Sequence, residues 1–315
     1  MRTSILWGVA NAAAAGALWG IIFLAPAVLP DFSPLELSVG RYLAYGVLSA
    51  IMLASRWKSL RPRLGRREWS GLFELSLTGN LVYFVLLAFA VQTAGGAASS
   101  LIVGLVPVVV TLVALRDPAS IPLRHLLPAL ALSISGVTLV GWQALASEQV
   151  STTWTMRLLG LLCAFGALLS WSAYSIRNSR WLARRPDISG YEWSLLIGVM
   201  TGLVSLVLVP VSYMASTQTH PAGRWMAFAA VSAGLAIMAS ILGNAFWNKT
   251  SRLLPMSLAG QMIVFETIFA LIYTFVWQLR WPTLIEGLAI VCMLAGVVLC
   301  ARAHDSGRHG VTSGD

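Results

Sequence analysis

Charge is scarce in this sequence. Charged residues occupy 10% of its 315 positions, whereas hydrophobic residues occupy 57%. A soluble domain normally carries about 25% charged residues, so this chain has too few to cover a water-facing surface. The shortage argues against a soluble domain and indicates an integral membrane protein.

Cysteine and histidine are also scarce, which narrows the available chemistry. Three cysteines fall inside apolar runs, without the spacing of a disulfide framework or a metal site: Cys163, Cys292 and Cys300. The histidines lie at the ends of apolar runs, in a loop or in the tail: His125, His220, His304 and His309. The sequence therefore offers neither a Ser–His pair nor a histidine-rich metal set at membrane depth. It predicts no enzyme activity, no cofactor and no metal.

Long apolar runs make up most of the sequence. A helix needs about 20 mostly apolar residues to cross the hydrocarbon core. Ten stretches meet this requirement: roughly 5–29, 35–55, 68–91, 95–115, 122–143, 156–178, 189–214, 224–247, 257–279 and 282–302. We therefore predict an all-α membrane protein with ten transmembrane helices. The first stretch is too long for the apolar region of a signal peptide, so we expect it to be a true span.

The basic residues predict an orientation. Lys and Arg concentrate in cytoplasmic loops of membrane proteins. With the amino terminus inside, 17 of the 21 Lys and Arg residues fall on the cytoplasmic side and three on the other side, with Arg41 inside a span. Because these residues lie between apolar runs, the net charge of +9 does not indicate nucleic-acid binding. We predict a multi-pass protein of the cell membrane with both termini cytoplasmic.

The two halves of the chain resemble each other. Gly95–Pro107 in the fourth span and Pro255–Thr267 in the ninth both run from a turn residue through small residues to branched apolar residues. Trp19 in the first span and Trp171 in the sixth hold comparable positions. Chance likeness between apolar helices is the alternative interpretation.

Five spans per half is an odd number, so the second half enters the membrane in the opposite sense. This predicts a 5+5 inverted repeat, an arrangement in which transporters bind substrate near the midplane between the halves. The predicted first repeat covers residues 1–148 and the second covers 149–303. A polar, disordered cytoplasmic tail is expected at 304–315.

Short motifs in order along the chain resemble the drug/metabolite transporter superfamily, in its EamA-type branch. The motifs are Ala17–Gly20, Gly40–Ala44, Ala94–Pro107, Phe246–Pro255, Phe265–Ala270 and Leu294–Leu299. The resemblance implies a 5+5 inverted-repeat transporter that exports small metabolites across the bacterial inner membrane. One motif departs from the family pattern, because Glu266 is followed by Thr267 where the family commonly has proline.

Ionisable side chains inside spans are costly and mark functional candidates. Arg41, in the second span, is suited to bind a substrate carboxylate bidentately; pairing with an acid or reaching to the outer interface are the alternatives. Glu266, in the ninth span, is a candidate to pair with Arg41, bind a substrate amine or take up a proton. A structural hydrogen-bonding role is its alternative. Glu74, in the third span, is a weaker candidate.

Neutral polar and aromatic residues complete the predicted cavity. Ten of the thirteen tryptophans lie near span ends, as in an interfacial belt, but Trp19, Trp171 and Trp247 do not. The full predicted substrate-binding set is Trp19, Arg41, Glu74, Asn80, Tyr83, Trp171, Tyr174, Asn244, Trp247, Asn248, Gln261 and Glu266. Helix–helix hydrogen bonding and aromatic core packing are the alternative roles.

These features favour a secondary transporter that works by alternating access. A channel or facilitator is the alternative, although no filter element is visible, and an intramembrane enzyme is a weaker one. The expected partners are a small-molecule substrate, an amino acid or a related compound, and the lipid bilayer, with proton coupling through Glu266 as a hypothesis. No nucleic-acid partner is expected.

Overall fold

The computed structural model describes residues 2–114, 123–146, 153–216, 220–254 and 262–311. Every regular element in these ranges is helical, which confirms the all-α prediction. In chain order the elements are α1 (Arg2–Gly20), η1 (Ile21–Phe23), α2 (Ala25–Val28), α3 (Pro34–Ala54), α4 (Trp57–Leu60), η2 (Arg61–Arg63), α5 (Arg66–Ser76), η3 (Leu77–Leu81), α6 (Val82–Ala94), α7 (Gly96–Val103), α8 (Val106–Ala114), α9 (Leu123–Ala146), α10 (Trp154–Arg184), α11 (Gly190–Ala215), α12 (Ala222–Leu235), η4 (Ala236–Gly243), α13 (Asn244–Leu253), α15 (Val264–Trp277) and α16 (Leu284–Val311).

Within the described residues, seven helical runs are long and apolar enough to cross a membrane. They are Leu6–Val28, Pro34–Ala54, Arg66–Ala94, Leu127–Ala146, Trp154–Arg184, Gly190–Ala215 and Ala222–Thr250. Three further apolar helices are shorter: Gly96–Val109, Val264–Trp277 and Leu284–Gly296. Each of these segments falls on one of the predicted spans.

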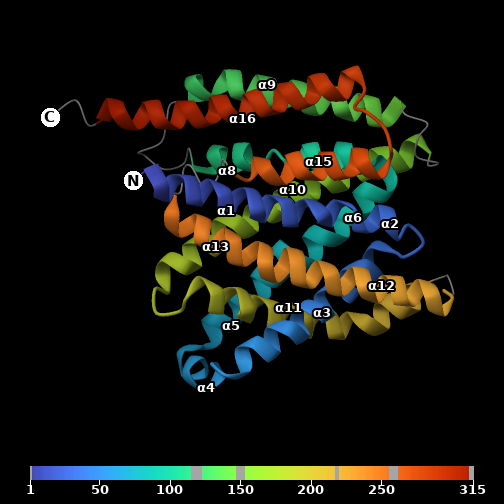
Figure 1. The fold of residues 1–315 in the computed structure, drawn as a ribbon, viewed down its shortest axis with the longest axis vertical. Coiled ribbons are helices and arrows are strands. Elements are labelled where there is room, and N and C mark those ends of the chain that lie inside the picture. Colours follow the sequence, from blue (N-terminus) through green and yellow to red (C-terminus); the bar gives the residue numbers. More distant parts are fainter. Residues whose placement is uncertain (1, 115–122, 147–152, 217–219, 255–261, 312–315) are drawn as a thin grey trace.

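The helices lie side by side, with their axes running across the view in Figure 1. The start of α1 and the end of α16 lie at one end of this bundle, which we name the terminal end. The turns before α3, α12 and α16 lie at the other, which we name the opposite end. Helices from the two halves of the chain pair with each other: α16 packs on α9, α11 on α3 and α10 on α6.

The α3–α11 pair shows how local sequence sets this packing. Each helix begins at a capping box. A serine hydroxyl accepts a hydrogen bond from the backbone N–H of a glutamate, and the glutamate carboxylate accepts one from the backbone N–H of the serine. The pairs are Ser33 with Glu36 and Ser189 with Glu192. Gly46 and Gly202, each thirteen residues after its serine, meet where the helices cross. A Cβ added to Gly46 would lie 2.5 Å from the Cα of Gly202, so the crossing requires glycine.

The last helix extends into the segment that was expected to be a tail. The sequence predicts a disordered tail from His304, but α16 continues to Val311. Extending an existing helix adds a hydrogen bond for each residue fixed, without a new nucleation step. A polar composition alone therefore does not end this helix.

Candidate functional site

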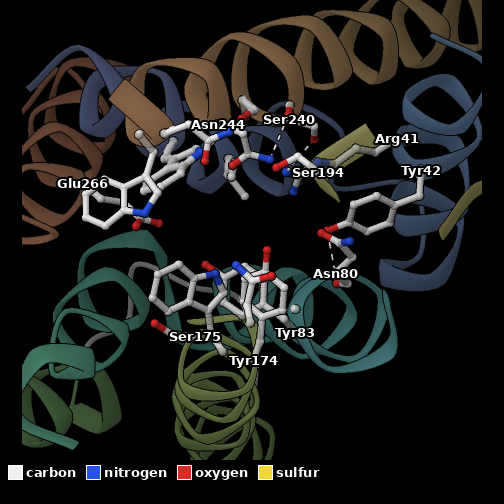
Figure 2. Close-up of a pocket in the computed structure, with 18 residues that line it drawn as sticks. Arg41, Tyr42, Asn80, Tyr83, Tyr174, Ser175, Ser194, Ser240, Asn244 and Glu266 are labelled. Atoms are coloured by element: carbon white, nitrogen blue, oxygen red, sulfur yellow. Dashed lines mark hydrogen bonds between the residues drawn. The ribbon is translucent and has the colours of Figure 1, made fainter. Parts of the chain in front are cut away.

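A cavity of about 100 Å³ lies inside the bundle, between helices from both halves of the chain. Such a volume approaches the ~150 Å³ of protein cavities that accept benzene. Ten of the twelve predicted site residues line it: Trp19, Arg41, Asn80, Tyr83, Trp171, Tyr174, Asn244, Trp247, Asn248 and Glu266. Figure 2 shows the labelled members of this set around the central space. Substrate binding by these residues stays a prediction.

The other two predicted residues fall elsewhere. Glu74 pairs with Arg177 at 3.0 Å, and both side chains are nearly half exposed outside the cavity. Its carboxyl group therefore links α5 to α10 instead of facing the cavity. Gln261 lies outside the described residues.

Arg41 is the most unusual side chain in the site. Only 4% of it is exposed, so it does not reach to the interface. Its Nη2 donates to the hydroxyl of Ser240 at 3.3 Å, and its guanidinium lies 4.6 Å from the ring centre of Phe84. The buried Nε and Nη1 atoms have no hydrogen-bond acceptor among the described residues. Since unpaired buried donors are costly, these two N–H groups are suited to an anion from outside the chain.

Glu266 faces the cavity from across it. Its side chain is 7% exposed and lies in the first turn of α15, and Figure 2 places it on the side away from Arg41. Close packing fixes this turn, because a Cβ on Gly16 of α1 would lie 2.8 Å from the Glu266 nitrogen. The ion pairs of the described residues include neither Glu266 nor Arg41. The direct pairing considered from the sequence is therefore not formed.

The three tryptophans that do not fit the interfacial belt meet at this site. Trp19 packs edge-on against Trp171 at 6.4 Å between ring centres and lies 5.3 Å from Trp247. Tyr174 extends the group, 6.2 Å from Trp171. The indole N–H of Trp19 donates to the Ala239 carbonyl at 3.0 Å, which fixes the ring. The cavity thus has one apolar wall of aromatic faces.

Two π-helices provide the polar wall, and sequence analysis missed them both. The segments η3 and η4 interrupt the third and the eighth predicted spans, one in each half of the chain. π-Helical turns often occur at functional sites. Asn80 of η3 donates to Thr201 at 2.9 Å, and Ser240 of η4 accepts from Arg41. No residue pattern in these spans indicates the change in helical register.

Several lining residues were also missed: Ile22, Tyr42, Gly79, Ser175, Asn178, Ser194, Ala239 and Ser240. Among them, Tyr42 directly follows Arg41 in the second-span motif. This adjacency was the sequence feature that could have indicated Tyr42 as a lining residue. Its hydroxyl donates to the Asn80 carbonyl at 3.1 Å. The cavity therefore combines aromatic faces, hydroxyls and amides with one basic and one acidic side chain at separate positions.

A family model, the EamA-like transporter family, matches residues 6–142 and 158–302. The chain belongs to this EamA-like transporter family. A relative, inner membrane protein YtfF of Escherichia coli (strain K12), is 34% identical over 307 residues, covering 94% of this chain and 95% of the relative. A solved crystal structure of another protein aligns over 96% of this chain and 99% of its own, with a TM-score of 0.63. At 19% identity that likeness concerns the fold alone.

Proposed function

We propose that this EamA-like protein is a secondary transporter that moves a small metabolite through the central cavity by alternating access. Membership in a transporter family favours transport over catalysis. The observation that carries the proposal is Arg41, which is buried in the cavity wall with two of its nitrogen atoms unpaired within the described part of the chain. Buried guanidinium donors of this kind are suited to bind a carboxylate through charge-assisted hydrogen bonds.

The helix lengths support a membrane arrangement. We propose that the three shorter apolar helices cross the membrane together with the seven longer ones, as ten spans. An even number of spans agrees with the start of α1 and the end of α16 lying at the same end in Figure 1. The excess of Lys and Arg supports a cytoplasmic location for that terminal end. The relative's description as an inner membrane protein supports the same membrane for this chain.

Three observations support a 5+5 inverted repeat, with halves at 1–148 and 149–303. The family model matches one segment in each half. The capping boxes of α3 and α11 are alike, and the glycines at equivalent positions meet where those helices cross. One π-helix interrupts a long span in each half. In alternating access the two halves then move against each other around the cavity.

The substrate class that fits the walls carries an anionic and a cationic group. Arg41 takes the carboxylate, and Glu266 takes the amine or a proton from across the cavity. The aromatic faces of Trp19, Trp171 and Trp247 accept an apolar body or a cation. An amino acid or a related small metabolite meets these requirements, and the family resemblance favours its export.

Proteoliposomes test the transport proposal. A thermal-shift screen of purified protein against amino acids selects the ligand, and counterflow of that ligand is then measured. Saturable counterflow is expected, with a loss of at least roughly tenfold in Arg41→Gln because a charged hydrogen-bond pair is removed. Arg41→Lys keeps the charge without the fork and is expected to retain part of the activity. Unitary ionic currents would instead identify a channel.

Proton coupling has its own test. If Glu266 carries a proton, Glu266→Gln abolishes uptake or efflux driven by a pH gradient but leaves counterflow, which needs no gradient. Equal rates of pH-driven transport in the wild type and this variant would overturn the coupling.

A further inference from the structure

A second charged cluster lies at the opposite end of the bundle, away from the cavity. Asp31 lies between α2 and α3, and Arg224 is the third residue of α12. The guanidinium binds both carboxylate oxygens, with Nε donating to Oδ2 at 2.9 Å and Nη2 to Oδ1. His220 Nδ1 lies 3.3 Å from the same Oδ2, and its side chain is 3% exposed. The Arg224 guanidinium lowers the pKa of Asp31, so the carboxylate is ionised near neutral pH.

Aromatic rings connect this cluster to helix α3, which carries Arg41 of the cavity wall. Phe32, next to Asp31 in the chain, stacks on His220 at 4.0 Å and on Phe228 at 4.7 Å between ring centres. Phe228 in turn packs against α3, where a Cβ on Gly40 would lie 2.3 Å from its Cζ. Gly40 directly precedes Arg41 of the cavity wall. The stack therefore reaches from the charged cluster to the level of the substrate site.

The cluster joins the two halves of the chain. Asp31 and Phe32 belong to the first half, and His220, Arg224 and Phe228 belong to the second. We propose that the Asp31–Arg224–His220 cluster and the aromatic stack beneath it form the gate that closes the cavity at the opposite end. This inference rests on the proposed transport function. Movement of the halves apart at this end must break these contacts before substrate can pass.

The exposure of the ion pair suits a reversible gate. Arg224 and Asp31 side chains are 36% and 27% exposed, so water can solvate both groups when they separate. A fully buried pair would leave uncompensated charges on opening. Arg280 and Glu286, at the same end, provide a matched comparison, because their 2.7 Å pair lies within the α15–α16 hairpin and does not join the halves.

Thiol labelling tests the gate without any substrate. The three cysteines are replaced by alanine, and Ser240→Cys supplies one reporter in the cavity wall. A membrane-impermeant methanethiosulfonate is applied to spheroplasts, from outside. Asp31→Asn and Arg224→Gln are each expected to raise the labelling rate about tenfold, because a bidentate charged hydrogen bond is lost. Arg280→Gln is expected to leave the rate unchanged.

Two further variants separate gating from misfolding. The exchange Asp31→Arg with Arg224→Asp is expected to restore slow labelling, because the pair is re-formed with reversed charge. Phe228→Ala leaves the ion pair in place and is expected to raise labelling by removing a ring of the stack. Unchanged labelling in the folded variants, or an equal rise in Arg280→Gln, would overturn the gate. An absence of counterflow in the wild type would instead overturn the transport proposal. The labelling rate does not depend on counterflow, so the two failures are distinguishable.

Discussion

The two ends of the bundle hold the halves of the chain together in different ways. At the opposite end, one cluster around Asp31 lies over stacked aromatic rings. At the terminal end, three ion pairs of the described residues join the halves: Arg56–Glu192 at 3.3 Å, Arg177–Glu74 at 3.0 Å and Arg185–Glu68 at 2.6 Å. One end therefore depends on a single arginine, whereas the other distributes its contacts.

Charged residues at the two ends nevertheless occupy equivalent positions relative to the helix starts, with basic and acidic residues exchanged. The third residue of α12 is Arg224, which binds Asp31, and the third residue of α5 is Glu68, which binds Arg185. Asp187 precedes its capping serine by two residues, as Asp31 does, but pairs with Arg185 of its own loop at 2.8 Å. These equivalent positions thus determine where the charged groups lie, while the identity of each residue decides whether it joins the halves.

The largest effect on stability is expected at the α3–α11 crossing. This crossing joins the two halves of the chain between the two ends of the bundle. Gly46→Leu forces a side chain against the Gly202 backbone, which lies 2.5 Å from a Cβ at this position. Overpacking of this kind costs about 1–3 kcal/mol, so the Tm falls in a thermal melt of the purified protein. Gly234→Leu is the control, because a Cβ there meets nothing within 4 Å. Equal Tm changes in the two variants would contradict a tight crossing.

The sequence predicts the apolar helices well because a helix in lipid must satisfy its own backbone, a requirement that acts segment by segment. It also identifies Arg41 and Glu266, because a charge at membrane depth is conspicuous without any neighbour. The expected place of Glu74 in the cavity differs from the structure for the complementary reason. Its partner Arg177 is distant in sequence, and only the packing of α5 on α10 brings the two side chains together. The π-helices likewise depend on neighbouring helices.

The next largest effect is expected when the terminal end loses all three pairs. A triple variant with Arg56→Gln, Glu68→Gln and Glu74→Gln leaves the opposite end intact. Three partly exposed pairs contribute up to about 1 kcal/mol each, so labelling of Ser240→Cys from the terminal side rises by roughly tenfold or more. Inside-out vesicles with an impermeant reagent measure this rate. Labelling from the opposite side should not rise, and a rise there would contradict separate closure of the two ends.

A single substitution at the terminal end is expected to do much less. Glu68→Gln removes one pair of three, so labelling from that side should rise less than about fivefold, the equivalent of about 1 kcal/mol. This is smaller than the effect expected from Arg224→Gln at the opposite end. The same vesicles give the rate. If Glu68→Gln alone matched the triple variant, the terminal end would depend on one pair, and the contrast between the ends would disappear.

The smallest effect is expected from mild acid. Arg224 lowers the pKa of Asp31 below its usual 3.8, so the pair is fully formed above about pH 4 and weakens only as pH falls through the lowered pKa. Among the residues that the structure describes, Arg224 and His220 are the charged or titratable groups that face this carboxylate.

Labelling of the Ser240→Cys reporter from the opposite side should therefore change less than about twofold between pH 8 and pH 5, once corrected for the reactive thiolate fraction. A cysteine in place of Trp281, which is 90% exposed at the same end, gives that correction. Asp31→Asn should label fast at every pH, because the charge that acid would remove is already absent. A corrected rate that rises in the parent protein as pH falls to 5 would mean that a group other than Asp31 holds this end closed.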